Sequence, residues 1–179
     1  MSFKPFLRLL CDGRLTALLG AGAELKSFYK LSYVAAAGNA GLLNRLAIRP
    51  ATLDSLAEFY TARGQGREAL EAFLQMGLRL RLLRLGPRGY TLRGLANSLA
   101  QPKNDPTLAM VEEVAGLHHK LISGTLPKLL RGELWSLADQ DGELIARSSR
   151  VLEAFQAEII ERTIPTQGVL RLLEIGCGS

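Results

Sequence analysis

Four residues near the end of the chain have the types and spacing of a loop that binds a nucleotide-like cofactor. Glu174, Gly176, Cys177 and Gly178 follow an apolar, strand-like run that begins at Val169. A strand that runs into Gly-x-Gly lets the backbone turn sharply and approach a ligand closely, because glycine has no Cβ to obstruct it. An acidic residue just before the first glycine lies at the carboxyl end of the strand, where open α/β sheets bind ligands. The pattern therefore predicts a strand followed by a loop that a ligand can approach closely, although Gly-x-Gly alone is a weak signal.

The string Leu-Leu-Glu-Ile-Gly-Cys-Gly-Ser over 172–179 resembles the first motif of the class I S-adenosylmethionine-dependent methyltransferases. In that family the glycines line the methionyl part of the cofactor, and the acidic residue joins the hydrogen-bond network beside it. The resemblance implies that Gly176, Gly178 and Glu174 bind S-adenosylmethionine, with Cys177 between the two glycines.

The third glycine of this motif would be residue 180, past the last residue of the sequence. The acidic residue that holds the ribose would follow about 20 residues further on. We therefore expect most of the sheet, the substrate pocket and the catalytic residues beyond residue 179. The chain would be the N-terminal part of a methyltransferase, inactive by itself, whose parent acts on a small molecule or a carrier-bound intermediate.

Two side chains in the middle of the chain are candidates for contact with that substrate. In small-molecule methyltransferases, the helices that precede the cofactor domain line the substrate pocket. The resemblance therefore implies that His118 or Trp135 touches substrate in the parent enzyme. The alternative is a structural role for the pair His118 and His119, with one packed and one in solvent. Neighbours on a helix point about 100° apart and no Asp, Glu or Cys completes a ligand set four residues on, so we expect no metal site.

Arg147 and Arg150 precede the predicted strand. By the same resemblance either could hold the carboxylate of the cofactor. The alternative is a capped helix N-terminus with both arginines in solvent.

The elements that must position these residues begin with two helices in the region 50–77. Thr52 has the type and position of an N-cap for the first helix. The second helix is predicted from about Arg67 to Met76, with Gly77 as its C-terminal stop.

A β-hairpin is predicted after the second helix. Leu78, Leu80 and Leu82 alternate with arginines, the string Gly-Pro-Arg-Gly over 86–89 has turn chemistry, and the extended pattern resumes over 90–92. Two helices followed by such a wing resemble the winged-helix family. More narrowly, the strings over 41–44, 50–53, 56–57 and 90–92, with the hairpin between, resemble the N-terminal domain of the dimeric small-molecule O-methyltransferases. That resemblance implies dimerisation and substrate enclosure, with a homodimer as the assembly.

The main alternative is a winged-helix regulator that binds DNA, and a stand-alone dimerisation or interaction module is another. A DNA-reading second helix should be basic, yet Arg67 is set against Glu68 and Glu71 there. The positive charge lies in the wing instead, on Arg79, Arg81, Arg84, Arg88 and Arg93. We therefore expect no nucleic-acid partner, and a solvated wing.

The flanks of this region read as helices. Glycines divide residues 3–46 into two to four short predicted helices. The clearest of them, Glu24–Ala37, has an apolar stripe of Leu25, Phe28, Tyr29 and Leu31. This stripe is either one wall of the core or a dimer-forming element. Beyond a polar link at 102–106, helices are expected over 107–123, 125–130 and 149–162, the last burying Leu152, Phe155 and Ile159.

Composition sets the fold class. Leucine supplies 36 of the 179 residues while aromatic residues make up only 6%, which favours helices over sheet. We predict a mainly α chain: a helical N-terminus and winged helix with a β-hairpin wing over 1–101, a helical connector over 102–165, and the first strand of an incomplete Rossmann-like α/β domain over 166–179.

Charge and hydropathy indicate where the chain works. The net charge of +5 divides into +8 over residues 1–100 and −3 over 101–179. No leucine-rich stretch approaches the roughly 18 uninterrupted apolar residues of a membrane span. We therefore expect no membrane partner. The start of the sequence lacks the apolar core of a signal peptide, and we interpret Cys11 and Cys177 as free thiols. Both observations predict a cytoplasmic location.

Overall fold

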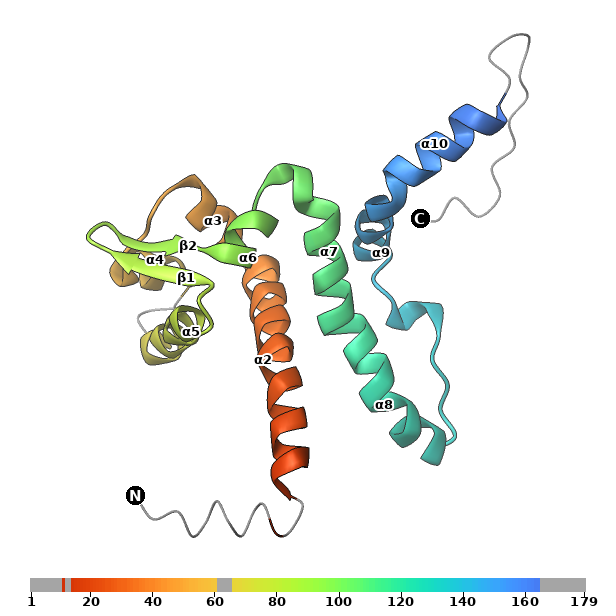
Figure 1. Cartoon of the computed structure of the whole chain (residues 1–179), viewed down its shortest axis with the longest axis horizontal. Coiled ribbons are helices and arrows are strands. Elements are labelled where there is room, and N and C mark those ends of the chain that lie inside the picture. The colour runs from red at the N-terminus through yellow and green to blue at the C-terminus, as the bar shows by residue number, and fades with distance from the viewer. Residues whose placement is uncertain (1–10, 12–13, 61–65, 165–179) are drawn as a thin grey trace.

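The computed structural model describes residues 11, 14–60 and 66–164. In this part the chain is mainly helical, with one antiparallel hairpin (Figure 1). The predicted strand and cofactor loop, with Glu174, Gly176, Cys177 and Gly178, lie outside the described residues.

The elements follow one another with short connections. The first half contains α2 (Arg14–Asn39), α3 (Leu42–Ile48), α4 (Leu53–Tyr60), α5 (Arg67–Arg79), β1 (Leu83–Gly86), β2 (Gly89–Leu92) and α6 (Gly94–Leu99). The second half contains α7 (Asp105–Glu113), a π-helical turn (Val114–His118), α8 (His119–Leu130), α9 (Gly142–Ser149) and α10 (Glu153–Thr163). Short 3₁₀ turns at Pro102–Asn104, Leu137–Asp139 and Arg150–Leu152 join some of them.

Helix α2 is one long helix, and the prediction of short pieces divided by glycines is wrong there. Gly20, Gly22 and Gly38 lie inside it, because a helix interior tolerates glycine at a cost of only about 1 kcal/mol each. The chain first breaks at Gly41, whose φ of +72° is the left-handed conformation that glycine adopts without strain.

The helix pair and the hairpin are confirmed. Thr52 precedes α4, and its hydroxyl accepts a hydrogen bond from the Ser55 amide at 3.2 Å, as an N-cap does. The hairpin turns at Pro87 and Arg88, with Gly86 opposite Gly89. Ala51 adds an antiparallel bridge to Tyr90, so the segment between α3 and α4 lies against the outer side of the hairpin.

The start of the hairpin differs from the prediction. Helix α5 passes through Gly77 and ends at Arg79, and β1 begins only at Leu83. Arg81 then turns the chain with a left-handed φ of +59°. The alternating leucines 78, 80 and 82 all point toward the core, so their period of two comes from a helix end and a turn rather than from a strand.

The core lies where α2, α3, α7 and the hairpin meet. Its largest fully buried side chains are Tyr33, Val34, Leu43, Leu56, Leu74, Leu82 and Leu83. Leu108 and Val111 of α7 share this core with the first hundred residues. Gly77 is required there, because a Cβ at this position would overlap the Tyr33 hydroxyl and lie 2.9 Å from Leu83 Cδ1.

The connector also departs from the predicted boundaries. α7, the π turn and α8 form one continuous helical rod from Asp105 to Leu130, so Gly124 does not end a helix. Helix α9 was not predicted, and the helix expected over 149–162 is divided into a 3₁₀ turn at Arg150–Leu152 and α10. Its apolar residues Leu152, Phe155 and Ile159 are exposed rather than buried, with Phe155 at 65%. The helical period identified an apolar face correctly but not a partner for it.

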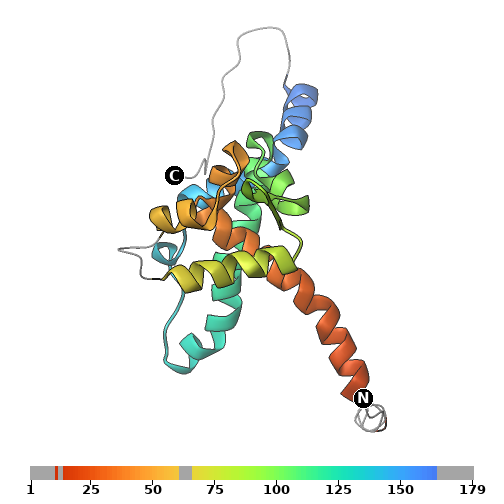
Figure 2. The same cartoon turned by 90° about the vertical axis from the view of Figure 1, so that its left-hand side faces the viewer.

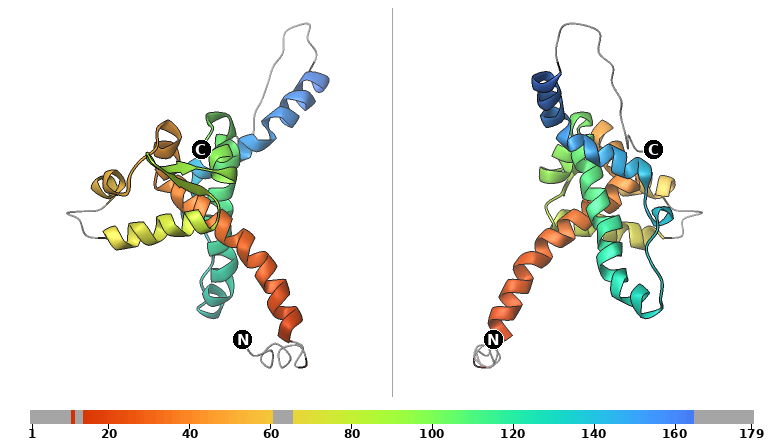
Figure 3. Two further views of the ribbon diagram at one scale, coloured as in Figure 1. Left: turned by 60° about the vertical axis from the view of Figure 1, so that its left-hand side comes forward. Right: turned by 90° about the vertical axis from the view of Figure 1, so that its right-hand side faces the viewer.

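Two helices extend away from the core. The N-terminal half of α2 and the end of α8 leave it on the same side and diverge from each other, which the three directions of view show together (Figures 1, 2 and 3). Helix α10 leaves the core in the opposite direction. Across residues 14–60 and 66–164, no helix combines the length and apolarity that crossing a membrane requires.

Candidate functional site

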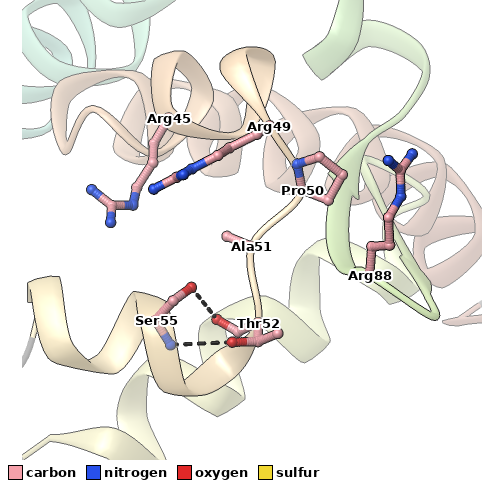
Figure 4. A pocket seen from close by; sticks show the side chains of 7 residues that line it. All are labelled: Arg45, Arg49, Pro50, Ala51, Thr52, Ser55 and Arg88. Atoms are coloured by element: carbon pink, nitrogen blue, oxygen red, sulfur yellow. Dashed lines mark hydrogen bonds between the residues drawn. The ribbon is translucent and has the colours of Figure 1, made fainter.

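A pocket with three arginines in its wall lies between α3, α4 and the tip of the hairpin (Figure 4). Its cavity measures about 250 Å³ and is lined by Arg45, Arg49, Pro50, Ala51, Thr52, Ser55 and Arg88. Among these lining residues there is no carboxylate. The arginines come from the end of α3, the residue after it, and the hairpin turn, so the site depends on the tertiary fold.

The backbone between α3 and α4 sets the shape of this pocket. Ala51 exchanges two backbone hydrogen bonds with Tyr90, at 3.2 and 2.8 Å. Gly89 allows this approach, because its φ is +104° and a Cβ there would overlap the Ala51 carbonyl. The hairpin turn that carries Arg88 is therefore fixed beside Pro50.

The arginine side chains differ in orientation. Figure 4 shows Arg45 and Arg49 extending to the same side, above Ser55, while Arg88 lies on the other side of Pro50. The guanidinium of Arg45 lies over the Phe59 ring, 4.3 Å from its centroid, which orients the group without neutralising its charge. The nearest acidic residue in sequence, Asp54, pairs with Arg67 at 2.5 Å instead.

Sequence reasoning missed this pocket because it considered only the wing arginines, Arg88 among them. Arg45 lies in α3, but Arg49 follows the last residue of that helix with an extended backbone, so the two do not share a helix face that the sequence could indicate. The contribution of Arg88 depends on the Ala51 to Tyr90 bridge, which no local pattern indicates.

The remaining wing arginines do not converge on a pocket of this kind. Arg81, Arg84 and Arg93 are exposed around the hairpin. Helix α5 carries Glu68 and Glu71 against two arginines and has no net charge.

The two predicted substrate contacts lie apart from this pocket and touch different residues. The His118 Nε2 atom is 3.2 Å from Glu113 Oε1. The two residues are five apart and meet because they flank a π-helical turn, whose wider winding aligns such a pair. His118 and His119 are both exposed, so the expectation of one packed histidine is wrong, although the His119 ring is 5.8 Å from that of Phe28.

Trp135 folds back onto α8. Its indole nitrogen donates a hydrogen bond to Thr125 Oγ1 at 3.0 Å, and the Lys128 ammonium lies 4.4 Å from the ring centroid. Its ring edge packs on Gly124, where a Cβ would lie 3.0 Å away. The residue is half-buried, and its packing on α8 accounts for this position without a ligand. A substrate contact by His118 or Trp135 stays a prediction.

Arg147 forms ion pairs and is not a solvated arginine. Its guanidinium is 2.6 Å from Asp105 Oδ1 and 3.5 Å from Glu112 Oε2, which ties α9 to α7. The hydrogen bond from Arg147 lowers the pKa of Asp105. Burial raises the pKa of Glu112, which is only 3% exposed, although Arg147 counteracts the shift. Arg150 is 3.4 Å from Glu153.

A serine, a glutamate and a histidine meet beside this ion-pair cluster. The Ser148 hydroxyl donates to Glu113 Oε2, while the other oxygen of Glu113 faces His118. The carboxylate lies between the two residues, so the imidazole has no path to deprotonate the hydroxyl and the order does not suit nucleophilic catalysis. The described part of the chain holds no group of three or more His, Cys, Asp or Glu residues suited to a metal.

A further feature is the apolar surface of the extended helices. Along α2 the exposed apolar side chains are Leu18, Leu19, Leu25, Phe28, Tyr29 and Leu31. Along α8 they are Ile122, Leu126, Leu129 and Leu130. Of the two alternatives for the α2 stripe, a wall of the core is therefore wrong within one chain. A helix segment with this many exposed apolar side chains is typical of an interaction site.

Comparison with protein-family models, with curated proteins and with solved structures found no match to this chain.

Proposed function

We propose that this chain is the N-terminal portion of an S-adenosylmethionine-dependent methyltransferase, with dimerisation and substrate enclosure as its task. The methyltransferase assignment rests on the string Glu-Ile-Gly-Cys-Gly over 174–178. Under this proposal Glu174, Gly176 and Gly178 contact S-adenosylmethionine, and the acceptor is a small molecule or a carrier-bound intermediate.

One observation carries the task assigned to the described residues. The N-terminal half of α2 presents leucines and aromatic residues to solvent, although the same helix packs Tyr33, Val34 and Ala37 tightly into the core at its other end. Burying an apolar side chain contributes about 1.5–3 kcal/mol, so a surface of this size favours association. A second copy of the chain, giving a homodimer, is the partner that the proposal requires.

The middle of the chain supports the same proposal. The order α3, the Ala51 bridge, α4, α5 and the hairpin corresponds to a winged helix, as the resemblance to small-molecule O-methyltransferases implies. Helix α5 occupies the place of a DNA-reading helix but has no net positive charge. This disfavours DNA binding, because duplex recognition requires neutralisation of phosphates.

The methyl transfer itself would take place in the cofactor domain. Transfer from sulfur to a nucleophile requires alignment of nucleophile, methyl group and sulfur, with a base where the nucleophile is protonated. The α2 and α8 surfaces would contribute by closing the substrate site against water. His118 and Trp135, on the rod and on the segment that follows it, are the residues that would reach such a site.

A titration of S-adenosylmethionine tests the assignment. The protein translated from the reading frame continued beyond Ser179 should bind the cofactor with micromolar affinity, and the 179-residue chain should bind it far more weakly. Gly178→Val should abolish binding, because a side chain at this position obstructs the approach of the ligand. Cys177→Ala is the matched control and should leave the affinity unchanged, because the middle residue of the motif lies beside the cofactor through its backbone and not its side chain. Absence of binding by the longer protein would exclude the methyltransferase assignment.

A further inference from the structure

We propose that the pocket lined by Arg45, Arg49, Thr52, Ser55 and Arg88 binds the phosphate group of a small organic phosphate monoester. This site does not depend on the methyltransferase assignment. We call this site the arginine pocket.

The first argument is charge that has no counter-charge. Arg45, Arg49 and Arg88 line a single cavity of about 250 Å³, and its lining within the described residues includes no carboxylate. Elsewhere in the same structure arginines find acids: Arg67 pairs with Asp54, Arg131 with Glu133 and Arg162 with Glu158, at 2.5 to 2.6 Å. Arg45 and Arg49 extend their like charges to the same side of this cavity, and an anion that enters it would be attracted by both.

The second argument is geometry. In Figure 4 the guanidinium groups of Arg45 and Arg49 extend to one side of the pocket, above the hydroxyls of Ser55 and Thr52. Phe59 covers one face of the Arg45 guanidinium and leaves its edge N–H groups available. Guanidinium edges bind phosphate oxygens in a bidentate way, and the Thr52 hydroxyl can add a donor, whereas the Ser55 hydroxyl already donates to the Thr52 carbonyl.

The third argument is local rigidity. The floor of the pocket is held by the backbone bonds between Ala51 and Tyr90 and by the Thr52 to Ser55 capping bonds at 3.2 and 3.1 Å. The first turn of α4 faces the pocket, and its positive dipole end adds to the arginine charge. A preformed site of this kind loses little entropy when a ligand binds.

The size of the pocket and the charge of its surroundings favour a small ligand over duplex DNA. A phosphate group fits a cavity of this volume, whereas a duplex would also face Glu68 and Glu71 on α5. Arg84 of the wing is exposed and does not line the pocket. Substituting Arg84 should therefore weaken binding of a duplex but not binding of a phosphate monoester.

The test uses the 179-residue chain with phenyl phosphate, inorganic phosphate, chloride at equal ionic strength, and a short duplex DNA. Titrations followed by amide and arginine Nε–H chemical shifts should show saturable binding of both phosphates at the first turn of α4 and at Arg45 and Arg49. Phenyl phosphate should bind at least as well as inorganic phosphate. Chloride should produce no saturable change.

Two variants separate the pocket from general surface charge. Arg49→Gln should weaken phenyl phosphate binding by about fivefold or more, since a charge-assisted contact is lost. Arg84→Gln, which removes the same charge outside the pocket, should leave it within about twofold. Urea unfolding of Arg49→Gln establishes that the exposed substitution leaves the fold intact.

The proposal is wrong if phenyl phosphate fails to saturate, or if the two variants weaken it equally. Duplex DNA that binds more tightly than phenyl phosphate, and that loses affinity equally in Arg84→Gln and Arg49→Gln, would assign the surface to nucleic acid instead. Loss of S-adenosylmethionine binding in the longer protein would leave these results unchanged, so failures of the two proposals are distinguishable.

Discussion

The two ends of α2 have the same kind of residues and opposite surroundings. At its C-terminal end, Tyr33 stacks on Phe73 with ring centroids 4.4 Å apart and is fully buried. At its N-terminal half, Phe28 and Tyr29 contact each other at 6.0 Å and are about half exposed. The first region is complete within one chain, whereas the second has apolar surface in excess of what the chain covers. The first region therefore supplies stability, and we propose the second as the surface for association.

The largest expected effect on stability comes from truncating a leucine in the core beside the buried end of α2, compared with one in the exposed half of α2. Leu43 is 0% exposed, so Leu43→Ala should lower the free energy of unfolding by about 2–5 kcal/mol. Leu25 is 48% exposed, so Leu25→Ala should change that of the monomer by less than about 0.5 kcal/mol. Urea unfolding at low protein concentration measures both. Equal losses would show that α2 is packed along its whole length.

Glycine substitutions should change stability in opposite directions. Gly77→Ala places a methyl group on the Tyr33 hydroxyl and should cost about 1–3 kcal/mol. Gly20 has open space around it, so Gly20→Ala should raise helicity and stabilise α2 by up to about 1 kcal/mol. Far-ultraviolet circular dichroism and urea unfolding check the two effects. Destabilisation by Gly20→Ala would reveal a partner packed closely against that position.

The Arg147 cluster lies beside the buried end of α2, where a Cβ at Gly38 would overlap Glu112 Oε1. Arg147→Met leaves Asp105 and Glu112 without their cation and should cost about 1–2 kcal/mol at neutral pH. The folded-state pKa of Asp105 is lowered, so this carboxylate stabilises the fold above its ordinary value of 3.8 and loses that contribution as the pH falls through the folded pKa.

The raised pKa of Glu112 has the opposite effect on stability, because ionisation of this carboxyl above its ordinary value of 4.5 lowers the free energy of unfolding. Removing Arg147 leaves that cost uncompensated at neutral pH. The difference in the free energy of unfolding between wild type and Arg147→Met should therefore shrink as the pH falls, first as Glu112 is protonated and then, below pH 3.8, as Asp105 is protonated. Unfolding curves across this pH range measure it, and a constant difference would exclude an electrostatic cause. Arg150→Met, at a mostly exposed pair with Glu153, is the control and should have a small effect.

The sequence predicts the features that depend on local residues and misses those that depend on tertiary contacts. Local signals located α4, the turn at 86–89 and the Thr52 cap, because capping and turn chemistry act within a few residues. They failed at Gly77 and Gly124, where a tertiary neighbour, Tyr33 or Trp135, decides why glycine is present. They also failed for Phe155, because periodicity marks an apolar face and does not say what covers it. The arginine pocket was missed since Arg88 reaches it only through the Ala51 to Tyr90 bridge.

The measurement that tests the central claim most directly is sedimentation equilibrium of the 179-residue chain with substitutions on α2. The wild type should sediment at twice the mass of one chain at micromolar concentration. Leu25→Ser combined with Phe28→Ser should raise the dimer dissociation constant by about tenfold or more, because the apolar area that these two side chains would bury at the interface is lost. Ile48→Ser, at an exposed apolar residue of α3, is the matched control and should remain dimeric. A wild type that stays monomeric, or a double variant that associates as strongly as wild type, would contradict the assignment of α2 as the dimer surface.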